Sequence, residues 1–256
     1  MSWSERQKAM LAEMGLRVWA PAAVDEAAAV PTASPDAAPT PSDPPVGVPL
    51  AVSRAPVKRE VAPDGSEVAT LDWPALRVAV DQCRACALCE GRRNAVLGSG
   101  ATRPRWLIVG EAPGEQEDAS GLPFVGPSGQ LLDAMLAALA LPRDGGDVYI
   151  TNAVKCRPPG NRNPQSAELA ACLPFLQRQI ALLQPRVILA LGRVAAQALL
   201  HSTEPLGRLR GQVHQIDGTP VVVSYHPAYL LRNPIDKARA WEDLCLAAAV
   251  ADAAAR

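Results

Sequence analysis

Apolar residues beyond about position 100 fall into short continuous runs, separated by turn residues and by longer segments with helical spacing. Four runs have the length and composition of strands buried on both faces: residues 106–109, 147–154, 186–192 and 220–225. The segments between them predict helices from about Ser128, over 166–183 and over 193–200, and a last helix over 241–255. Strands that alternate with helices in this way predict an α/β fold, with a parallel sheet covered by helices on both faces.

The first 70 residues have a different pattern. Residues 4–16 predict a short helix with Ser4 as its N-cap, so we expect an N-terminal helical segment over 1–20. Residues 21–70 are rich in Pro and Ala and almost without aromatic residues, a composition that buries too little surface to order itself. This pattern predicts a disordered linker over 21–70, followed by one folded domain over 71–256 that begins with a helix capped by Asp72.

Three polar residues lie at the ends of predicted strands. Glu111 follows the first strand in a loop rich in Gly and Pro, Asn152 lies near the end of the second, and His226 follows the fourth. Because ligands of open α/β sheets bind outside the carboxyl ends of the strands, we expect these side chains to share one pocket. Each alone also has a simpler interpretation, as a turn carboxylate, an Asn that satisfies its own turn, or a loop His before Pro.

Composition narrows the class of protein. The chain has 256 residues, 48% of them hydrophobic, which suffices for one sizeable core. No run approaches the roughly 18 apolar residues of a membrane span, and the N-terminal residues lack the apolar stretch of a signal peptide. We expect a soluble, cytoplasmic monomer with no membrane partner. Since the net charge is −1, any nucleic-acid site must be a local basic patch.

The six cysteines predict a metal site or reactive thiols, because nothing in the sequence indicates an oxidising compartment. Cys83 and Cys86 form a C-x2-C pair, and Cys156 and Cys172 follow at longer distances. Four thiolates can close a tetrahedral site for zinc or hold an iron–sulfur cluster, and spacing alone does not choose between them. Cys89 extends the first pair to C-x2-C-x2-C and could replace one of the four. We expect the sixth, Cys245, to be a small buried apolar residue on the last helix.

Five motifs occur in an order that resembles one known family. They are GEAPGEQED, GLPFVGPSGQLL, VYITNAVKCRPPGNRNP, VILALG and HPAYLLRNP. Together they are similar to the family 4 uracil-DNA glycosylases, the iron–sulfur branch of the uracil-DNA glycosylase superfamily, over roughly residues 80–245. The resemblance implies a three-layer α/β/α domain with a four-stranded parallel sheet. It also implies that Cys83, Cys86, Cys156 and Cys172 ligate a 4Fe-4S cluster, with Cys89 as the reserve ligand.

The resemblance further implies which residues bind the base. A base inside duplex DNA is unreachable, so such an enzyme flips it into a pocket. Phe124 matches the residue that stacks on the flipped base, and Gly110 and Ala112 match the loop around it. Asn152 can offer a donor and an acceptor to O4 and N3 of uracil, and cytosine presents the opposite polarity there.

The chemistry implied for the two remaining pocket residues concerns charge. The N-glycosidic bond breaks towards an oxocarbenium-like sugar and an anionic uracil, and His226 is placed to donate a hydrogen bond to O2 of that anion. Glu111 is the candidate for positioning the attacking water and balancing positive charge on the sugar. Whether it acts as a true general base stays open, because an oxocarbenium ion needs little help from a nucleophile.

The same resemblance suggests how DNA is held. Leu230 matches the superfamily's wedge, which fills the space that the flipped base leaves, with Tyr229, Leu231 and Arg232 beside it. Basic residues are candidates for contacts to phosphates, with a solvated face as the simpler interpretation of each: Arg157, Arg162, Arg208, Arg210 and Arg232.

Three other interpretations compete with a hydrolytic glycosylase. Some relatives trap uracil-DNA covalently through a His in an inserted basic loop, but residues 119–126 have neither insertion nor His. A non-catalytic DNA-binding module of the same fold would not need Glu111, Asn152 and His226 together. A nucleotide-binding enzyme would need a G-x-G-x-x-G spacing or a Lys after the loop, and both are absent at GEAPG. The N-terminal helix and linker could bind a repair or replication protein.

Overall fold

The computed structural model describes residues 65–254, so the predicted N-terminal helix and nearly all of the predicted linker lie outside the described residues. The first described helix, α2 (Gly65–Val68), falls within the range that we assigned to the linker. Its Val68 is buried and belongs to a cluster that includes Phe175 and Cys172 of a later helix. Packed structure therefore begins several residues before position 71.

The sheet has six strands in the order β1-β3-β2-β4-β6-β5. The four in the middle are parallel, as predicted, and comprise β3 (Val148–Asn152), β2 (Trp106–Gly110), β4 (Val187–Leu191) and β6 (Thr219–Ser224). Two short antiparallel strands, β1 (Ser99–Gly100) and β5 (Val213–Ile216), border the sheet. Neither was predicted: β1 has two residues, and β5 alternates between exposed and partly exposed positions, so neither forms an apolar run.

Several helix boundaries agree with the sequence pattern. The helix α3 (Trp73–Asp81) is capped by the Asp72 carboxylate, which accepts a hydrogen bond from the Ala75 N–H. The last helix begins four residues earlier than predicted. The described helices are, besides these, α4 (Leu88–Gly91), α5 (Glu115–Ser120), α6 (Pro127–Ala138), η1 (Pro159–Asn161), α7 (Ser166–Leu183), α8 (Arg193–Leu200), α9 (Leu206–Leu209), α10 (Pro227–Arg232), η2 (Pro234–Asp236) and α11 (Lys237–Ala253).

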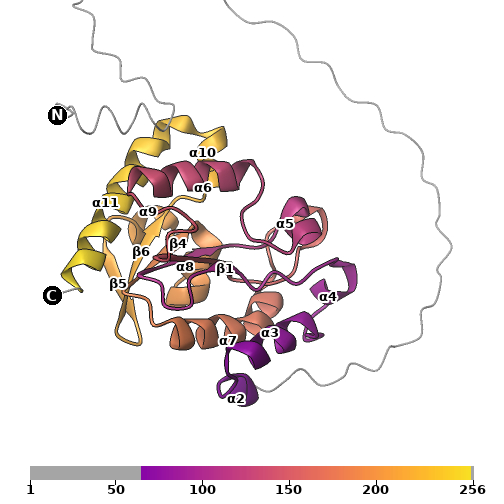
Figure 1. Ribbon diagram of the computed structural model, residues 1–256. Coiled ribbons are helices and arrows are strands. Elements are labelled where there is room, and N and C mark those ends of the chain that lie inside the picture. Colours follow the sequence, from indigo (N-terminus) through magenta and orange to yellow (C-terminus); the bar gives the residue numbers. More distant parts are fainter. Residues whose placement is uncertain (1–64, 255–256) are drawn as a thin grey trace, which may run out of the picture.

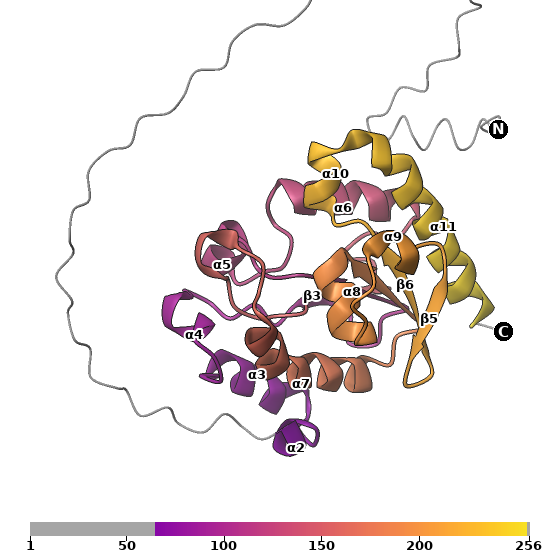
Figure 2. The ribbon, with the colours of Figure 1, turned by 180° about the vertical axis from the view of Figure 1, so that it is seen from behind.

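Alternate residues of each strand face two separate cores, because successive side chains of a strand point to opposite faces. Ile108 and Leu189 face the core shared with α6 and α11, whereas Leu107 and Ile188 face the core shared with α7 and α8. Figures 1 and 2 show α6, α10 and α11 on one side of the sheet and α3 and α7 on the other. The three-layer α/β/α class is thus confirmed.

A third cluster of buried residues lies beside the second core. It joins α2, α3 and α4 to α7 and includes Cys156 and Cys172, with Cys83 and Cys86 packed against it. Cys245 is different: it is exposed on α11, so the prediction that it is buried was wrong. Its neighbours Leu244 and Ala247 face the core, and the periodicity of the helix turns position 245 outwards. Within residues 65–254, no helix is long and apolar enough to span a membrane.

Candidate active site

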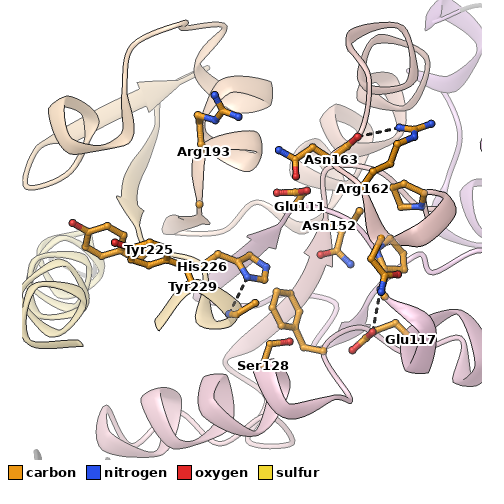
Figure 3. Close-up of a pocket in the computed structure, with 18 of the residues that line it drawn as sticks. Glu111, Glu117, Ser128, Asn152, Arg162, Asn163, Arg193, Tyr225, His226 and Tyr229 are labelled. Carbon is orange, nitrogen blue, oxygen red and sulfur yellow. Dashed lines mark hydrogen bonds between the residues drawn. The ribbon is translucent and has the colours of Figure 1, made fainter. Parts of the chain in front are cut away.

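A pocket of about 630 Å³ opens at the carboxyl edge of the sheet. Glu111, Asn152 and His226 all line it, as predicted, and Figure 3 shows them around one cavity. The parallel ladder explains the convergence, because Gly110 pairs with Asn152 across β2 and β3 and puts both strand ends at one level. His226 follows the end of β6 and caps α10.

Asn152 is placed to read a ligand. Its side chain is buried, yet the Nδ2 donor has no hydrogen-bond partner within the described structure. A Cβ on Gly110 would come within 2.4 Å of the Asn152 Oδ1 and 2.5 Å of the Phe124 ring. Gly110 therefore leaves room for the side chains of Asn152 and Phe124 to meet. A buried amide donor without a partner costs about 1–3 kcal/mol, which a bound acceptor would recover.

Phe124 is held in a backbone conformation that an L-residue rarely adopts, with φ of 53°. Arg143 fixes this segment from one side, donating hydrogen bonds of 2.9 Å to the carbonyls of Pro123 and Phe124. The Phe124 ring stacks on the His226 ring, with centroids 5.5 Å apart and planes 28° apart. Strain of about 1–3 kcal/mol at such a residue persists only where the surroundings determine it, so the position of this ring is built in.

Glu117 fixes the same segment from the other side. Its carboxylate accepts hydrogen bonds from the N–H groups of Gly114, Val125 and Gly126 at 3.0, 2.9 and 3.1 Å. Glu117 and its neighbour Asp118 are both buried, although they belong to an acidic stretch at the start of a helix. Glu117 thus joins the loop after β2, which carries Glu111, to the loop before α6.

The hydrogen bond of His226 determines which of its ring nitrogens can act. Nδ1 accepts a 3.1 Å hydrogen bond from the Ala228 N–H at the start of α10. Burial, assisted by the charge of Arg232 and opposed by that of Glu117, lowers the pKa of His226 to about 4. The ring is therefore neutral near pH 7, and because Nδ1 is an acceptor, Nε2 carries the proton.

Glu111 lies in a partly buried position beside Arg193, the first residue of α8. Burial raises the pKa of the Glu111 carboxyl, and the Arg193 charge opposes that rise. The backbone carbonyl of Glu111 accepts from Val154, so this loop is tied to the segment after β3. Figure 3 shows Arg193 on the α8 side of the pocket. Arg193 was missed by the sequence analysis, because a helix-initial Arg carries no motif.

The predicted phosphate contacts separate into two groups. Arg232 is exposed and lines the pocket. Arg193, which was not predicted, is also exposed and lines the pocket. Neither residue forms a salt bridge within residues 65–254. Arg162 also lines the pocket, but two of its nitrogens bind Glu168. Arg157 pairs with Glu115 at 3.4 Å, and Arg208 is exposed outside the pocket.

Arg210 has a structural role instead of the predicted phosphate contact. Its Nε donates to the buried Asp243 at 2.7 Å, another of its nitrogens donates to the Arg239 carbonyl, and its guanidinium lies 4.1 Å from the centre of the Tyr225 ring. That ring stacks on Tyr229. Arg210 therefore braces the wall of the pocket from behind.

Leu230 does not fit the predicted wedge. The side chain is completely buried in the core beneath α10, so it cannot enter DNA in this structure. Its neighbour Leu231 is 45% exposed. Counting four residues from His226 located the right helix, but the helical period turns residue 230 inwards and residue 231 outwards. The burial of Leu230 therefore gives no support to its prediction as the wedge.

Five cysteines surround a second, small cavity. Cys83, Cys86 and Cys89 lie in and beside α4, Cys156 follows β3, and Cys172 is on α7. Within residues 65–254, no three Cys, His, Asp or Glu side chains are arranged to hold a single metal ion.

Two cations accompany these thiols. Arg92 donates a 2.9 Å hydrogen bond to the Cys156 Sγ, which opposes the rise in the Cys156 pKa caused by burial. Lys155 lies at the cavity, and its backbone N–H donates to the Cys172 Sγ at 3.3 Å. Donors directed at sulfur and positive charge nearby both favour thiolates, so the residues fit a group held by several Cys ligands.

A sequence model of the uracil DNA glycosylase superfamily matches residues 97–247. The chain belongs to the uracil DNA glycosylase superfamily. Among its relatives, the type-4 uracil-DNA glycosylase of Pyrobaculum aerophilum is 45% identical over 184 residues, which cover 69% of this chain and 93% of the relative. That of Thermotoga maritima is 43% identical, covering 62% and 83%. A type-5 enzyme of Pyrobaculum aerophilum is 35% identical, covering 52% and 66%. These similarities confirm the resemblance noted in the motifs.

In this member of the uracil DNA glycosylase superfamily, the structural role of Glu117 was missed by the sequence analysis, although the sequence contains a signal for it. Gly114 and Glu117 stand in the N-cap and N3 positions of α5, the spacing of a capping box, and the Glu117 carboxylate does accept the Gly114 N–H. Arg143 had no such signal, because it reaches Phe124 only through the turn after α6.

Proposed function

We propose that this chain removes uracil from DNA by hydrolysing the N-glycosidic bond of a flipped deoxyuridine, which leaves an abasic site for base excision repair. Membership of the superfamily and the names of its type-4 relatives support this activity. The observation that carries the assignment to this pocket is the buried Nδ2 of Asn152, which has no hydrogen-bond partner within residues 65–254, next to a Gly110 that leaves space between the Asn152 and Phe124 side chains. The protein thus holds a buried donor in place, and a flipped base would supply the acceptor that this donor lacks.

Uracil would lie against the Phe124 ring and present its edge to Asn152. The amide can donate through Nδ2 to the O4 oxygen and accept through Oδ1 from the N3–H. Cytosine has an amino group and an unprotonated nitrogen at these positions, so both hydrogen bonds would become repulsive. A site built for one polarity rejects the other strongly, because its buried groups are left unpaired. Gly110 and Ala112 would line the backbone wall of this pocket.

His226 would stabilise the leaving group. The N–H of its Nε2 is the free donor of a neutral imidazole, and negative charge develops on uracil O2 as the glycosidic bond breaks. A fixed donor directed at developing charge acts mainly in the transition state, and removing one typically lowers kcat by about 10²–10³. The hydrogen bond from the Ala228 N–H to Nδ1 holds the ring in the tautomer that this role needs.

Glu111 would position the attacking water and balance the positive charge of the sugar. Its carboxylate is ionised above its raised pKa, and Arg193 limits that rise. The proton of the water would pass to this carboxylate as the C–O bond forms. General bases of this kind contribute about 10²–10⁴ to the rate.

We further propose that the thiol cavity holds a 4Fe-4S cluster ligated by Cys83, Cys86, Cys156 and Cys172, with Cys89 as an alternative ligand. When bound, the cluster would supply a cross-link between α3–α4, the segment after β3, and α7. The donors from Arg92 and Lys155 to sulfur support this choice. The same cross-link would hold the segment 157–162, which borders the active site.

DNA would approach from the open side of the pocket. Arg193 and Arg232 are our first candidates for phosphate contacts, and Arg162 is a third if Glu168 releases it. We propose Leu231, in place of Leu230, as the side chain that fills the gap left by the flipped base. The wedge matters most in duplex, so it bears on the preference between single and double strands.

The deciding experiment is cleavage of a labelled oligonucleotide with one uracil by protein purified without oxygen, alongside Glu111→Ala and a visible spectrum of both. Abasic sites and absorption near 400 nm, characteristic of such clusters, would support the glycosylase and its cofactor together. Glu115→Ala, which removes an exposed carboxylate at the start of α5, just after the loop that carries Glu111, is the matched control and is expected to cleave normally.

Two outcomes would replace this proposal. Coloured, folded protein that binds uracil-DNA without cleaving it would indicate a binding module. Oligonucleotide that stays attached to the protein through denaturing electrophoresis would indicate a covalent trap. A colourless but active protein would retain the glycosylase and remove the cluster.

A further inference from the structure

Lys155 is an unusual residue for a protein interior. Its side chain is only 1% exposed, and it forms no salt bridge within residues 65–254. The ammonium donates to three neutral oxygens: the Thr151 hydroxyl at 2.8 Å, the Asn152 carbonyl at 2.7 Å and the Gln179 side chain. Its hydrogen bonds are satisfied, but its charge is not balanced by a carboxylate. A buried charge is costly unless an opposite charge lies close by.

The thiols of the second cavity are the groups that could balance this charge. Lys155 lies between Asn152 and Cys156 in the sequence and lines the cavity that the five cysteines surround. The backbone N–H of Lys155 donates to the Cys172 Sγ. Ligation of a cluster would turn the surrounding thiols into thiolates, which carry the negative charge that the ammonium lacks.

Lys155 also contacts the residue that carries the amide of the pocket. The Lys155 ammonium binds the carbonyl of Asn152, and the next N–H, that of Ala153, donates to the Gly110 carbonyl at 2.9 Å. The peptide group after Asn152 is therefore fixed on both sides, at the point where β3 leaves the sheet. This fixes the backbone from which the Asn152 side chain projects into the pocket.

We propose that Lys155 is a positioning residue that couples the thiol centre to base recognition. The thiolates stabilise its buried charge, and its ammonium holds the carbonyl of Asn152 so that the amide faces uracil. The inference rests on the proposed function in one respect, the assignment of Asn152 as the residue that reads the base. It gives the cluster a role beyond cross-linking, since the charge of the ligands would determine how well the pocket is ordered.

The test is equilibrium dialysis with radiolabelled uracil, which measures base binding without catalysis. Lys155→Met keeps the apolar stem and removes the charge and all three donors. We expect uracil binding to weaken about tenfold, the lower end of the loss in metal affinity or activity that follows when an outer-shell partner of a metal site is removed. Thr151→Val is the matched control, because it removes one oxygen from the same ammonium and leaves the bond to the Asn152 carbonyl. It is expected to bind uracil within about twofold of the wild type.

The coupling itself is measured by preparing wild type and Lys155→Met with and without iron. Loss of iron should weaken uracil binding by the wild type about tenfold. It should not weaken binding by Lys155→Met any further, because the variant and the loss of iron remove the same interaction. Iron content, circular dichroism and binding to abasic-site DNA report whether each protein is folded. Lys155→Gln, which keeps donors at its amide, is the second variant and should fall between wild type and Lys155→Met.

Unchanged uracil binding by Lys155→Met or by Lys155→Gln, or additive effects of the variant and of iron removal, would overturn the coupling. So would an equal loss in Thr151→Val, which would make Lys155 a general support of the interior. The Asn152→Leu variant distinguishes failure of the coupling from failure of the assignment of Asn152 as the residue that reads the base. If that variant keeps the uracil affinity of the wild type, Asn152 does not read the base and the proposal falls with it; if it loses the affinity while Lys155→Met keeps it, only the coupling fails.

Discussion

The active-site pocket and the thiol cavity lie at the two ends of one short segment, Asn152 to Cys156, yet they are held in different ways. The pocket is held by hydrogen bonds within the chain: Glu117 and Arg143 fix the Phe124 segment, and the first turn of α10 fixes His226. The cavity gathers cysteines from α4 and the segment before it, from the segment after β3, and from α7, and the donors that reach its sulfurs come from Arg92 and Lys155. The pocket is organised by contacts within the protein itself, whereas the cavity is lined by sulfurs that come from separate segments.

This comparison makes a general prediction. Changes to the groups that face the pocket should lower activity with little effect on stability, because the strands beneath them are already complete. Changes to the thiols should lower stability and, through it, every activity of the protein. The variants below test that division.

The largest effect is expected for Glu111→Gln, which keeps the shape of the side chain and removes its charge. We expect kcat/KM for uracil excision to fall by about 10²–10⁴, the contribution of a general base, with the melting temperature and the absorption near 400 nm unchanged. Single-turnover cleavage assays and a thermal melt measure both. Glu115→Gln, at the start of α5 just after the loop that carries Glu111, is the control. A melting temperature that falls along with the rate would contradict the prediction that changes in the pocket leave stability unchanged.

Leu230 and Leu231 bring the same comparison into one helix. Leu230→Ala should cost about 2–5 kcal/mol of stability, because the side chain is completely buried. Leu231→Ala should leave stability within about 0.5 kcal/mol, because the side chain is half exposed, and should lower cleavage of duplex more than that of single strands. Urea unfolding and paired cleavage assays measure the two effects. A Leu230→Ala variant as stable as the wild type, together with a Leu231→Ala variant that cleaves duplex as fast as the wild type, would contradict both assignments.

Cys172→Ser tests the other region. Loss of one ligand should reduce the iron content and remove a cross-link between distant segments, at a cost of about 2–4 kcal/mol by analogy with a disulfide. Cys245→Ser, at an exposed thiol, should change neither iron content nor stability. Iron assays and denaturant titrations compare them. If Cys172→Ser binds iron as well as the wild type does, Cys89 has taken its place or the ligand set is different.

The smallest effect concerns pH. The pKa of His226 is lowered to about 4 in the folded protein, whereas an unfolded His titrates near 6.5. The unfolded chain therefore binds a proton first, so the stability that His226 contributes is complete above about pH 6.5 and is lost as the pH falls towards 4. Melting temperatures from pH 4 to 8 should show this slope, and His226→Leu should flatten it. The raised pKa of Glu111 should move the acidic limb of kcat/KM to higher pH than an ordinary Glu would give.

Much of the fold followed from local patterns. The four parallel strands, the Asp72 cap and the boundaries of α7 and α8 were predictable, because apolar runs, caps and helical periods are local properties of the chain. The pocket followed as well, since parallel strands put their carboxyl ends at one edge. The edge strands β1 and β5 could not be predicted, because pairing with a neighbour, and not apolar character, makes them strands.

Which face a residue presents was less predictable. The sequence motifs pointed to Leu230, but the packing of α10 against α6 decided that this residue is buried and Leu231 is exposed. Cys245 was expected inside for its chemistry and lies outside for its position on α11. Arg210 was expected to meet phosphate, and the buried Asp243 of a distant helix engages it instead. Leu230 and Arg210 are decided by partners that are far away in the sequence, whereas Cys245 is decided by its position in the helical period of α11.

The sequence by itself determined the family, the parallel core of the sheet and the types of chemical group that meet at its carboxyl edge, because these depend on motifs and on short-range periodicity. Only the tertiary structure decided which groups are free to act. Among the described residues it left the Asn152 donor unpaired, set the tautomer of His226 and buried Lys155 between the pocket and the cysteines. Burial and hydrogen bonding are settled by contacts between distant segments, and these are what set the charge, proton position and availability of a side chain.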